Sequence, residues 1–351
     1  MITPSLGAVT GEIQPAAGVP SSDALELVAD VALSPDEAGY VARARSANTL
    51  RGYRSDWREF ADWCAAHGHD PVPARPEAVS RYLTELARHG AKVGTMSRRI
   101  SAIRFAHTLR HLPDPCAHAR VQAVWEGIRR THGAPAQQSA PLMPPLLFDV
   151  VDACPTTRTW KTLGRAPEPD LAGLRDRALL LVGFVAALRR SELAAAAVDD
   201  LAEHPNGLVL SIPRSKTNQT GETAELVVLP RGSSQPHRSP TAALDTWLDT
   251  AGITGGPVFR PVSKGNRALD RPLNPESVNT LIRNAVARAG LDPRPYSAHS
   301  LRAGFVTYAH LRGSSDRAIA HQTRHRSLAT LTGYVRIHEA WTDNAATQLG
   351  F

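Results

Sequence analysis

From residue 46 onward, apolar residues recur at three- and four-residue steps, and proline or glycine ends most of these runs. This spacing puts the apolar side chains on one face of a helix, so the chain is expected to fold mainly into amphipathic helices packed against one another. Ser46 or Asn48 can cap the first helix, and Gly68 follows its end. Four helices in about 85 residues predict a small bundle. They are expected at residues 46–67, 76–89, 95–112 and 118–130.

The residues that follow this bundle have a different composition. Residues 132–145 are rich in Pro, Gln and Ser, which is typical of an extended linker at a domain boundary. Residues 174–188 are apolar on nearly every side and predict a central buried helix. Two short β-rich runs, at 208–213 and 224–229, flank a polar tip and predict a hairpin. Further helices are expected at residues 240–251, 275–290, 300–311, 316–322 and 328–335.

The predicted fold class is therefore mainly α with a small β-hairpin or sheet, in two domains. Residues 43–131 form the helical domain, 132–145 the linker, and 146–351 an α+β domain. Residues 1–42, rich in Ala, Pro, Gly and Ser, are predicted to be a mostly disordered arm with room for one short helix at 22–31.

Charge is distributed unevenly along the chain. Residues 1–40 hold six acidic residues and no Lys or Arg, whereas the rest holds all 40 basic residues against 27 acidic ones. The excess of basic residues after residue 40 favours a polyanionic partner, although a generic arginine-rich surface would have the same composition. On the third helix, Arg98, Arg99 and Arg104 make a basic face that suits DNA phosphates, and a solvated face would look much the same.

The composition also limits where the protein works. No run of 18 or more apolar residues occurs, and the N-terminus lacks the pattern of a secretory signal, so no membrane span or export is expected. The three cysteines, Cys64, Cys116 and Cys154, are far apart and never form a C-x-x-C pair. They are expected to be reduced and buried in a cytoplasmic protein.

Most of the residues that could carry chemistry lie in the last fifth of the chain, with Arg189 and Lys216 upstream. His299 and Arg302 are three residues apart, so both can point from one helical face at a single anion. Arginine forks bind phosphate oxygens, and a phenol can attack phosphorus and leave again, so the set suits a phosphodiester. The candidate catalytic residues are Arg189, Lys216, His299, Arg302, His325 and Tyr334, with Glu192 in support.

Each candidate also has a plain structural interpretation, which spacing alone leaves open. Arg189 and Glu192 could be an ordinary ion pair, and a lysine on a β-turn is usually solvated. A tyrosine near a C-terminus is more often packed than catalytic, and Tyr296 and Tyr308 are rivals for the nucleophile. His321 lies four residues before His325, but no carboxylate or thiolate at ligand spacing completes a metal site, so none is predicted.

Three motifs carry a resemblance to the tyrosine recombinase (phage integrase) family. Ala187-Leu188-Arg189-Arg190-Ser191-Glu192-Leu193 resembles the family's G-L-R-x-S-E-L, with Ala187 at the usual glycine. His299-Ser300-Leu301-Arg302 resembles H-x-L-R, its most specific short signature. His325-Arg326-Ser327 resembles the G-H-S run before the tyrosine, with Arg324 at the usual glycine, and Tyr334 follows at the family's spacing.

The resemblance implies roles for these residues. Arg189 binds the scissile phosphate, His299 and Arg302 act on the same group, and His325 donates to it. Lys216, on a hairpin similar to that of Cre-type members, is the implied general acid, and the neighbouring Arg214 is expected to contact DNA. Tyr334 is the implied nucleophile.

The resemblance also implies an activity and an assembly. The family's two domains form a clamp around duplex DNA, and its reaction is site-specific recombination through a 3′-phosphotyrosine and a Holliday junction. The expected partners are a DNA site with inverted repeats and three further copies in a homotetramer. Neither metal nor nucleotide is needed. The alternatives are a type IB topoisomerase-like enzyme, which would share the site, and a non-catalytic DNA-binding relative, which would lack one of its residues.

Overall fold

The computed structural model describes residues 34–41, 44–134, 138–160, 166–213, 225–232 and 235–325. The chain divides into two compact units, residues 1–136 and 137–351, which we call the helical unit and the catalytic unit. Within the described residues, no helix combines the length and hydropathy that a membrane crossing requires.

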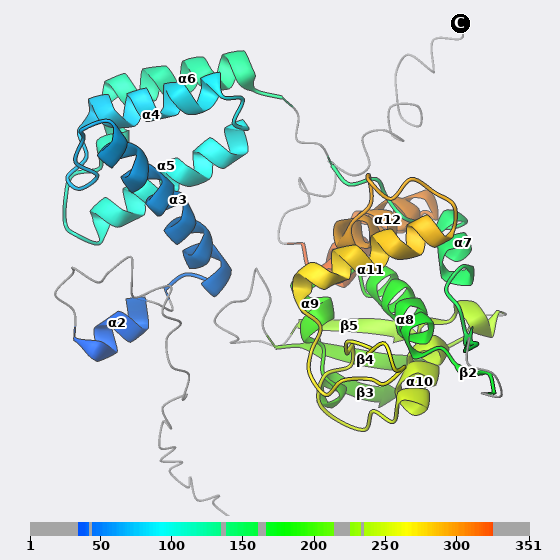
Figure 1. The fold of residues 1–351 in the computed structure, drawn as a ribbon. Coiled ribbons are helices and arrows are strands. Elements are labelled where there is room, and N and C mark those ends of the chain that lie inside the picture. Colours follow the sequence, from blue (N-terminus) through cyan, green and yellow to red (C-terminus); the bar gives the residue numbers. More distant parts are fainter. Residues whose placement is uncertain are drawn as a thin grey trace, which may run out of the picture. The chain divides into compact units, whose positions relative to one another are not determined.

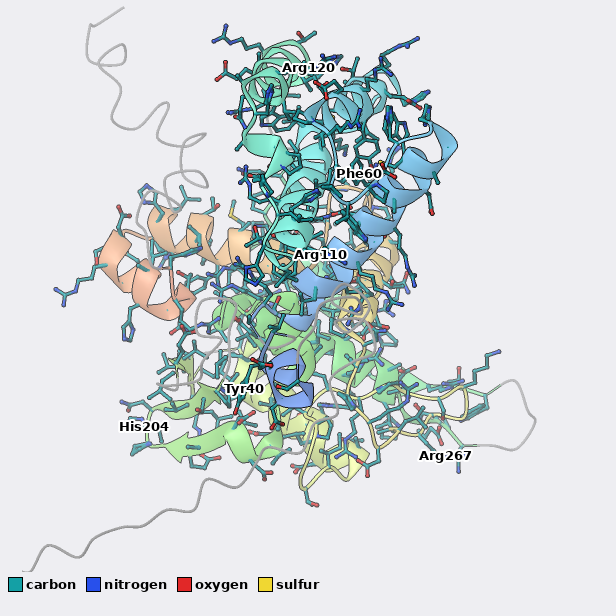
Figure 2. All side chains as sticks on the ribbon, turned by 90° about the vertical axis from the view of Figure 1, so that its left-hand side faces the viewer. Tyr40, Phe60, Arg110, Arg120, His204 and Arg267 are labelled. Carbon is teal, nitrogen blue, oxygen red and sulfur yellow. The ribbon has the colours of Figure 1, made fainter. Side chains whose placement is uncertain are left out.

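The helical unit is a bundle of α-helices with one 3-10 turn (Figure 1). Ser46 caps the first long helix by accepting a hydrogen bond from the backbone N–H of Thr49 at 3.2 Å. Phe60, Leu83 and Met96 lie fully buried in the centre of the bundle. Figure 2 shows Phe60 inside the bundle and Arg120 on its outer side. The elements are α2 (Pro35–Val41), α3 (Ala47–Ala66), α4 (Pro76–Arg88), α5 (Val93–Thr108), η1 (Pro115–Ala117) and α6 (Ala119–His132).

Two features of this unit differ from the sequence prediction. Helix α2 lies within the segment expected to be mostly disordered, at residues where no helix was predicted. Helix α5 ends at Thr108 rather than near residue 112. The reason is a turn in which His111 adopts a positive φ of 54° and the N–H of Leu112 returns to the carbonyl of His107 at 3.0 Å.

The catalytic unit packs helices around a small antiparallel sheet. Figure 1 shows α8 between the sheet and the helices α11 and α12. Its helices are α7 (Leu146–Asp152), α8 (Leu171–Val185), α9 (Arg190–Ala195), η2 (Val198–Asp200), η3 (Pro236–Arg238), α10 (Pro240–Ala251), α11 (Pro275–Arg288), α12 (Ala298–Leu311) and α13 (Asp316–Thr323). Its strands are β1 (Thr157–Arg158), β2 (Glu168–Pro169), β3 (Leu201–His204), β4 (Gly207–Ile212) and β5 (Glu225–Pro230).

The predicted hairpin is confirmed as β4 and β5, which pair antiparallel with Val209 opposite Val228. Strand β3 adds a third strand beside β4, and β1 and β2 form a separate two-residue pair; neither was predicted. The described residues of β3 are mostly exposed and have no alternating apolar pattern. Its pairing therefore depends on the neighbouring strand rather than on its own sequence.

The buried helix was predicted to end with Leu188, but α8 ends at Val185. The chain then turns through Ala187, whose φ is +47°, and Arg189 becomes the extended residue that caps the start of α9. Arg189 therefore begins a helix instead of ending one. A left-handed residue breaks the helical hydrogen bonds, and an apolar sequence pattern does not reveal where this happens.

Part of the predicted linker packs on the catalytic unit. The N–H of Ala140 donates to the carbonyl of Pro295 at 3.0 Å, and that of Leu142 donates to the carbonyl of Ser300 at 2.9 Å. A side chain at Gly304 would place its Cβ only 2.1 Å from the carbonyl oxygen of Leu142. Glycine at this position therefore allows the segment to lie against α12, the helix that carries His299 and Arg302.

The cysteines are free and buried, as predicted. Burial raises the pKa of the Cys64 and Cys154 thiols to about 11 and that of Cys116 to about 12. All three are accordingly protonated and unreactive near neutral pH.

Candidate active site

Glu192 holds the first predicted arginine, Arg189, by both its backbone and its side chain. One carboxylate oxygen of Glu192 accepts the backbone N–H of Arg189 at 2.8 Å, and the other accepts Nη1 of the same residue at 2.7 Å. The carboxylate is buried, whereas the Arg189 side chain remains partly exposed. The guanidinium is thereby fixed in orientation while one side remains accessible to a ligand.

Arg302 is a buried residue near the N-terminal end of α12, and its guanidinium links two loop turns of the chain. Its Nη1 donates to the carbonyl of Ala187 at 2.7 Å, and its Nη2 donates to the carbonyl of Thr323 at 2.5 Å. Nη2 also lies 3.1 Å from Nε2 of His325. One buried guanidinium thus connects the turn before Arg189 with the turn that carries His325. Four predicted residues, including His299 on the same helix, are brought to one region of the catalytic unit.

His325 is held as a neutral imidazole with a defined tautomer. Burial first, and then the charges of Arg302 and Arg189, lower its pKa to about 4. Because a guanidinium can only donate, Nε2 accepts from Arg302 and the proton is assigned to Nδ1. Nδ1 then donates to Oγ1 of Thr323 at 2.6 Å, and that hydroxyl donates to the carbonyl of Ile319 at 2.7 Å.

This tautomer bears on the predicted role of His325. Donation from Nε2 to a phosphate oxygen requires a proton on that atom, which means the other tautomer or the imidazolium form. In the present arrangement Nε2 is an acceptor that helps to orient Arg302.

His299 lies in the first turn of α12, where part of the residue is exposed to solvent although neighbouring groups partly desolvate its imidazole. Ser297 caps this helix, and its hydroxyl accepts the backbone N–H of His299 at 3.2 Å. Desolvation, followed by the charge of Arg302, lowers the pKa of His299 below its ordinary value. A neutral imidazole at this position can accept a proton, and the helix N-terminus favours an anion beside it.

Arg324 is a site residue that the sequence analysis did not assign. It caps α13 in the left-handed conformation, with φ +57°. Its side chain is only 5% exposed; Nη2 donates to Oε2 of Glu192 at 2.5 Å, and Nε lies 3.3 Å from Oε2 of Glu225. The only signal in the sequence was a charged residue at a position where the resemblance expects glycine.

The two residues that replace the glycines of the family motifs share a left-handed backbone conformation. Ala187 and Arg324, which both stand at usual glycines, have φ values of +47° and +57°. A residue with a Cβ is strained there by about 1 kcal/mol relative to glycine. The turns are therefore kept although their residues differ from the pattern.

Three predicted residues lie outside the described part of the chain. These are Lys216 and Arg214 on the segment between β4 and β5, and Tyr334 beyond residue 325. The rival tyrosines are described. The ring of Tyr308 packs 6.2 Å from that of Phe184, and the carbonyl of Tyr296 accepts from Nε of Arg283 at 3.0 Å.

The three arginines of the helical unit that are predicted to bind DNA each have a carboxylate partner within that unit. Arg98 forms a two-pronged contact with Asp56 at 2.6 and 2.9 Å, and Arg104 lies 2.7 Å from Asp114. Their side chains remain 54% and 50% exposed, whereas that of Arg99 is 13% exposed and contacts Glu59 and the Tyr82 hydroxyl. Contact with DNA stays a prediction for all three, and the exposed fractions favour Arg98 and Arg104.

Comparison with protein families matches both halves of the chain. The profile described as "Phage integrase family" matches residues 156–340, and "Phage integrase, N-terminal SAM-like domain" matches residues 40–109. Among curated proteins, the "Integrase/recombinase xerD homolog" of Selenomonas ruminantium is 34% identical over 88% of this chain and 86% of its own length. "Tyrosine recombinase XerD" of Corynebacterium glutamicum is 29% identical over 85% of this chain and 90% of its own.

Solved structures show the same fold at low sequence identity. One is the XerH site-specific recombinase bound to a palindromic difH substrate, in a post-cleavage complex. It aligns with a TM-score of 0.63 and 14% identity, covering 93% of this chain and 88% of that one. A lambda integrase dimer bound to a COC′ core site aligns with a TM-score of 0.54 and 14% identity, covering 90% and 84%.

Proposed function

The chain belongs to the phage integrase family of tyrosine recombinases, enzymes of site-specific DNA recombination, and we propose that it cuts and rejoins duplex DNA with Tyr334 as nucleophile. The observation that carries this proposal is the guanidinium of Arg302, which joins the turn before Arg189 to the turn of His325. In this proposal, Arg189, Arg302, His299 and His325 act together on one phosphodiester. The XerH and lambda integrase structures, both bound to DNA, support duplex DNA as the substrate.

The proposed cleavage step is a transesterification. The phenol oxygen of Tyr334 attacks phosphorus, the bond between phosphorus and the 5′ oxygen breaks, and a 3′-phosphotyrosine forms. His299, neutral because its pKa is lowered, accepts the phenol proton, and Lys216 gives a proton to the leaving 5′ oxygen. Rejoining is the reverse, with a 5′ hydroxyl as the attacking group.

Arg189 and Arg302 stabilise the charge that develops on the phosphorane. Both are held before substrate arrives, Arg189 by Glu192 and Arg302 by two backbone carbonyls, so little reorganisation is needed in the transition state. The cationic side chains supply the electrostatic stabilisation that a metal ion supplies in other phosphoryl-transfer enzymes. We therefore propose that the reaction requires neither metal nor nucleotide.

The assembly and cellular setting are proposed from the family. Four copies act on two DNA sites through a Holliday junction, and each site carries inverted repeats. The reaction takes place on DNA in the cytoplasm, where the three free cysteines stay reduced.

Substitution of Tyr334 by phenylalanine tests the nucleophile. Full-length protein first selects bound duplexes from a random DNA library, and a selected duplex with a nick beside the cleavage position traps the covalent product. The wild type is expected to give an SDS-resistant protein–DNA adduct. Tyr334→Phe is expected to give none while binding DNA normally, because one hydroxyl is lost from an otherwise unchanged cleft.

Tyr308→Phe is the matched control, since it removes a hydroxyl from a packed tyrosine of the same unit and should leave adduct formation intact. An adduct with Tyr334→Phe would disprove the assignment and direct attention to Tyr296 or Tyr308. No adduct with the wild type would count against the recombinase proposal itself.

A further inference from the structure

Arg324 joins three elements of the catalytic unit. It belongs to the C-terminal cap of α13, and its guanidinium contacts Glu192 on α9 and Glu225 at the start of β5. The two partners lie far away in sequence, 132 residues in the case of Glu192. Such a buried, charged side chain requires a reason beyond capping, because glycine caps a helix in this conformation without a charge to bury.

Glu192 presents an electrostatic problem for Arg189. Its carboxylate accepts both the backbone N–H and Nη1 of Arg189, and it is buried. At such distances in a poorly solvated region, a carboxylate cancels much of the field of its guanidinium partner. A carboxylate that only oriented Arg189 would therefore weaken the attraction of Arg189 for a phosphate.

The contact between Arg324 and Glu192 resolves this problem. Oε2 of Glu192, the oxygen that accepts the backbone N–H of Arg189, also accepts Nη2 of Arg324 at 2.5 Å. The three groups together carry one net positive charge instead of none. Glu225, whose Oε2 lies 3.3 Å from Nε of Arg324, offsets part of this charge from the sheet side; its side chain is 21% exposed, so water screens this contact more than the buried contact between Arg324 and Glu192.

We propose that Arg324 is a positioning residue that compensates the charge of Glu192, so that Glu192 can orient Arg189 without neutralising it toward the scissile phosphate. The inference rests on the proposed recombinase function. The backbone conformation of Arg324 also supports the proposal. A φ of +57° is strained for arginine, and such strain persists only where the surrounding contacts require the residue.

The first test replaces Arg324 by glycine, which relaxes the backbone and removes the side chain together with its charge. With the nicked duplex selected by the wild type, at saturating concentration, the single-turnover rate of adduct formation is expected to fall about 10- to 100-fold. The dissociation constant for the same duplex is expected to stay within about threefold of wild type. Arg317→Gln, which removes the charge of an exposed arginine on the same helix, is the control and should keep the wild-type rate.

The second test asks whether charge is the cause. Glu192→Gln is added to Arg324→Gly; it removes the uncompensated negative charge but keeps one oxygen to accept from Arg189. The double variant is expected to react at least about fivefold faster than Arg324→Gly alone. A merely structural role predicts the opposite, since each lost ion pair would loosen the site further.

Arg324→Lys and Arg324→Gln keep the test decisive if the glycine variant does not fold. Lysine retains the charge and glutamine retains only a donor, so lysine is expected to react about tenfold faster than glutamine. The proposal is wrong if Arg324→Gly reacts at the wild-type rate, if the double variant is no faster than the single one, or if lysine and glutamine are equivalent. These outcomes are read only when the wild type forms its adduct, which separates them from failure of the recombinase function.

Discussion

The two units each contain a buried carboxylate bound by two arginines, and they use it differently. In the helical unit, Asp56 on α3 binds Arg98 with both oxygens and lies 3.8 Å from Arg99, so two neighbouring helices are tied together. In the catalytic unit, Glu192 binds Arg189 and Arg324, which belong to the caps of two different helices. The ion pairs of Asp56 hold one helix face against another, whereas those of Glu192 hold two helix caps together.

The charge balance of the two clusters differs as well. Among the described residues, Arg98 and Arg99 are matched by Asp56 and Glu59. In the catalytic unit, Arg189 and Arg324 are matched by Glu192 and Glu225, and Arg302 adds a third positive charge that contacts the neighbouring turn of Ala187. An ion-pair network that binds substrate must retain positive charge, and a structural one need not.

A neutral histidine with a lowered pKa occurs in each unit, buried in the case of His107 and half-buried in the case of His325. In the helical unit, Nε2 of His107 accepts the backbone N–H of Ala74 at 2.9 Å, and Nδ1 donates to the carbonyl of Ile103 at 2.8 Å. Both of its nitrogens are therefore bound to backbone. His325 instead contacts the side chains of Arg302 and Thr323. The comparison shows that residue type and a lowered pKa do not separate a structural histidine from a candidate site histidine, whereas their hydrogen-bond partners differ.

The largest expected difference between the units is the response to a lysine in place of arginine. Arg302→Lys keeps the charge but loses the fork that reaches two carbonyls and His325, so adduct formation on saturating DNA should slow by about 10²- to 10³-fold. The matched variant Arg99→Lys in the helical unit should change this rate by less than about twofold. Single-turnover assays with thermal unfolding as a folding control measure both, and equal losses in the two variants would contradict the comparison.

The histidines predict a pH dependence of intermediate size. The folded pKa of His325 is lowered to about 4 from 6.5, and burial also lowers that of His107. The unfolded chain therefore binds more protons, and folding stability should fall as the pH drops from about 6.5 toward about 4. For His325 the shift corresponds to about 2 kcal/mol, after discounting for its partial exposure.

Urea unfolding at several pH values measures this loss in the full-length chain. His325→Gln should remove part of the pH dependence from the catalytic unit alone, and His107→Gln should remove it from the helical unit alone. A steeper loss of stability in His325→Gln between pH 6.5 and 4 would show that His325 is not held neutral.

The smallest expected effect concerns DNA affinity. Arg104→Ala should reduce the salt dependence of binding by about one phosphate contact, since its side chain is half exposed and held by only one described carboxylate, Asp114. Arg99→Ala should reduce the salt dependence less, because its side chain is mostly buried against Glu59 and Tyr82. Binding isotherms over a range of salt concentrations give both slopes. Equal slopes for Arg104→Ala and the wild type would remove Arg104 from the interface.

Much of the fold could be predicted from local patterns. Helical spacing and proline or glycine stops predicted α3, α4, α6 and α10 nearly to their ends, and alternating β-rich runs predicted β4 and β5. The motifs around Arg189, His299, Arg302 and His325 named the candidate residues, and Arg302 and His325 lie in contact in the structure. What failed were features decided at a distance, such as strand β3 and the early end of α8, where Ala187 takes a left-handed conformation.

The sequence by itself determined the helical bundle, the hairpin, the family and the order of the candidate residues, because these depend on periodicity and on short motifs. Only the tertiary structure decided how the site is held. The proton position on His325 follows from the guanidinium of Arg302, which can only donate. The role of Arg324 follows from Glu192, a carboxylate 132 residues away in the chain. Such contacts depend on how distant turns pack, and no local pattern records them.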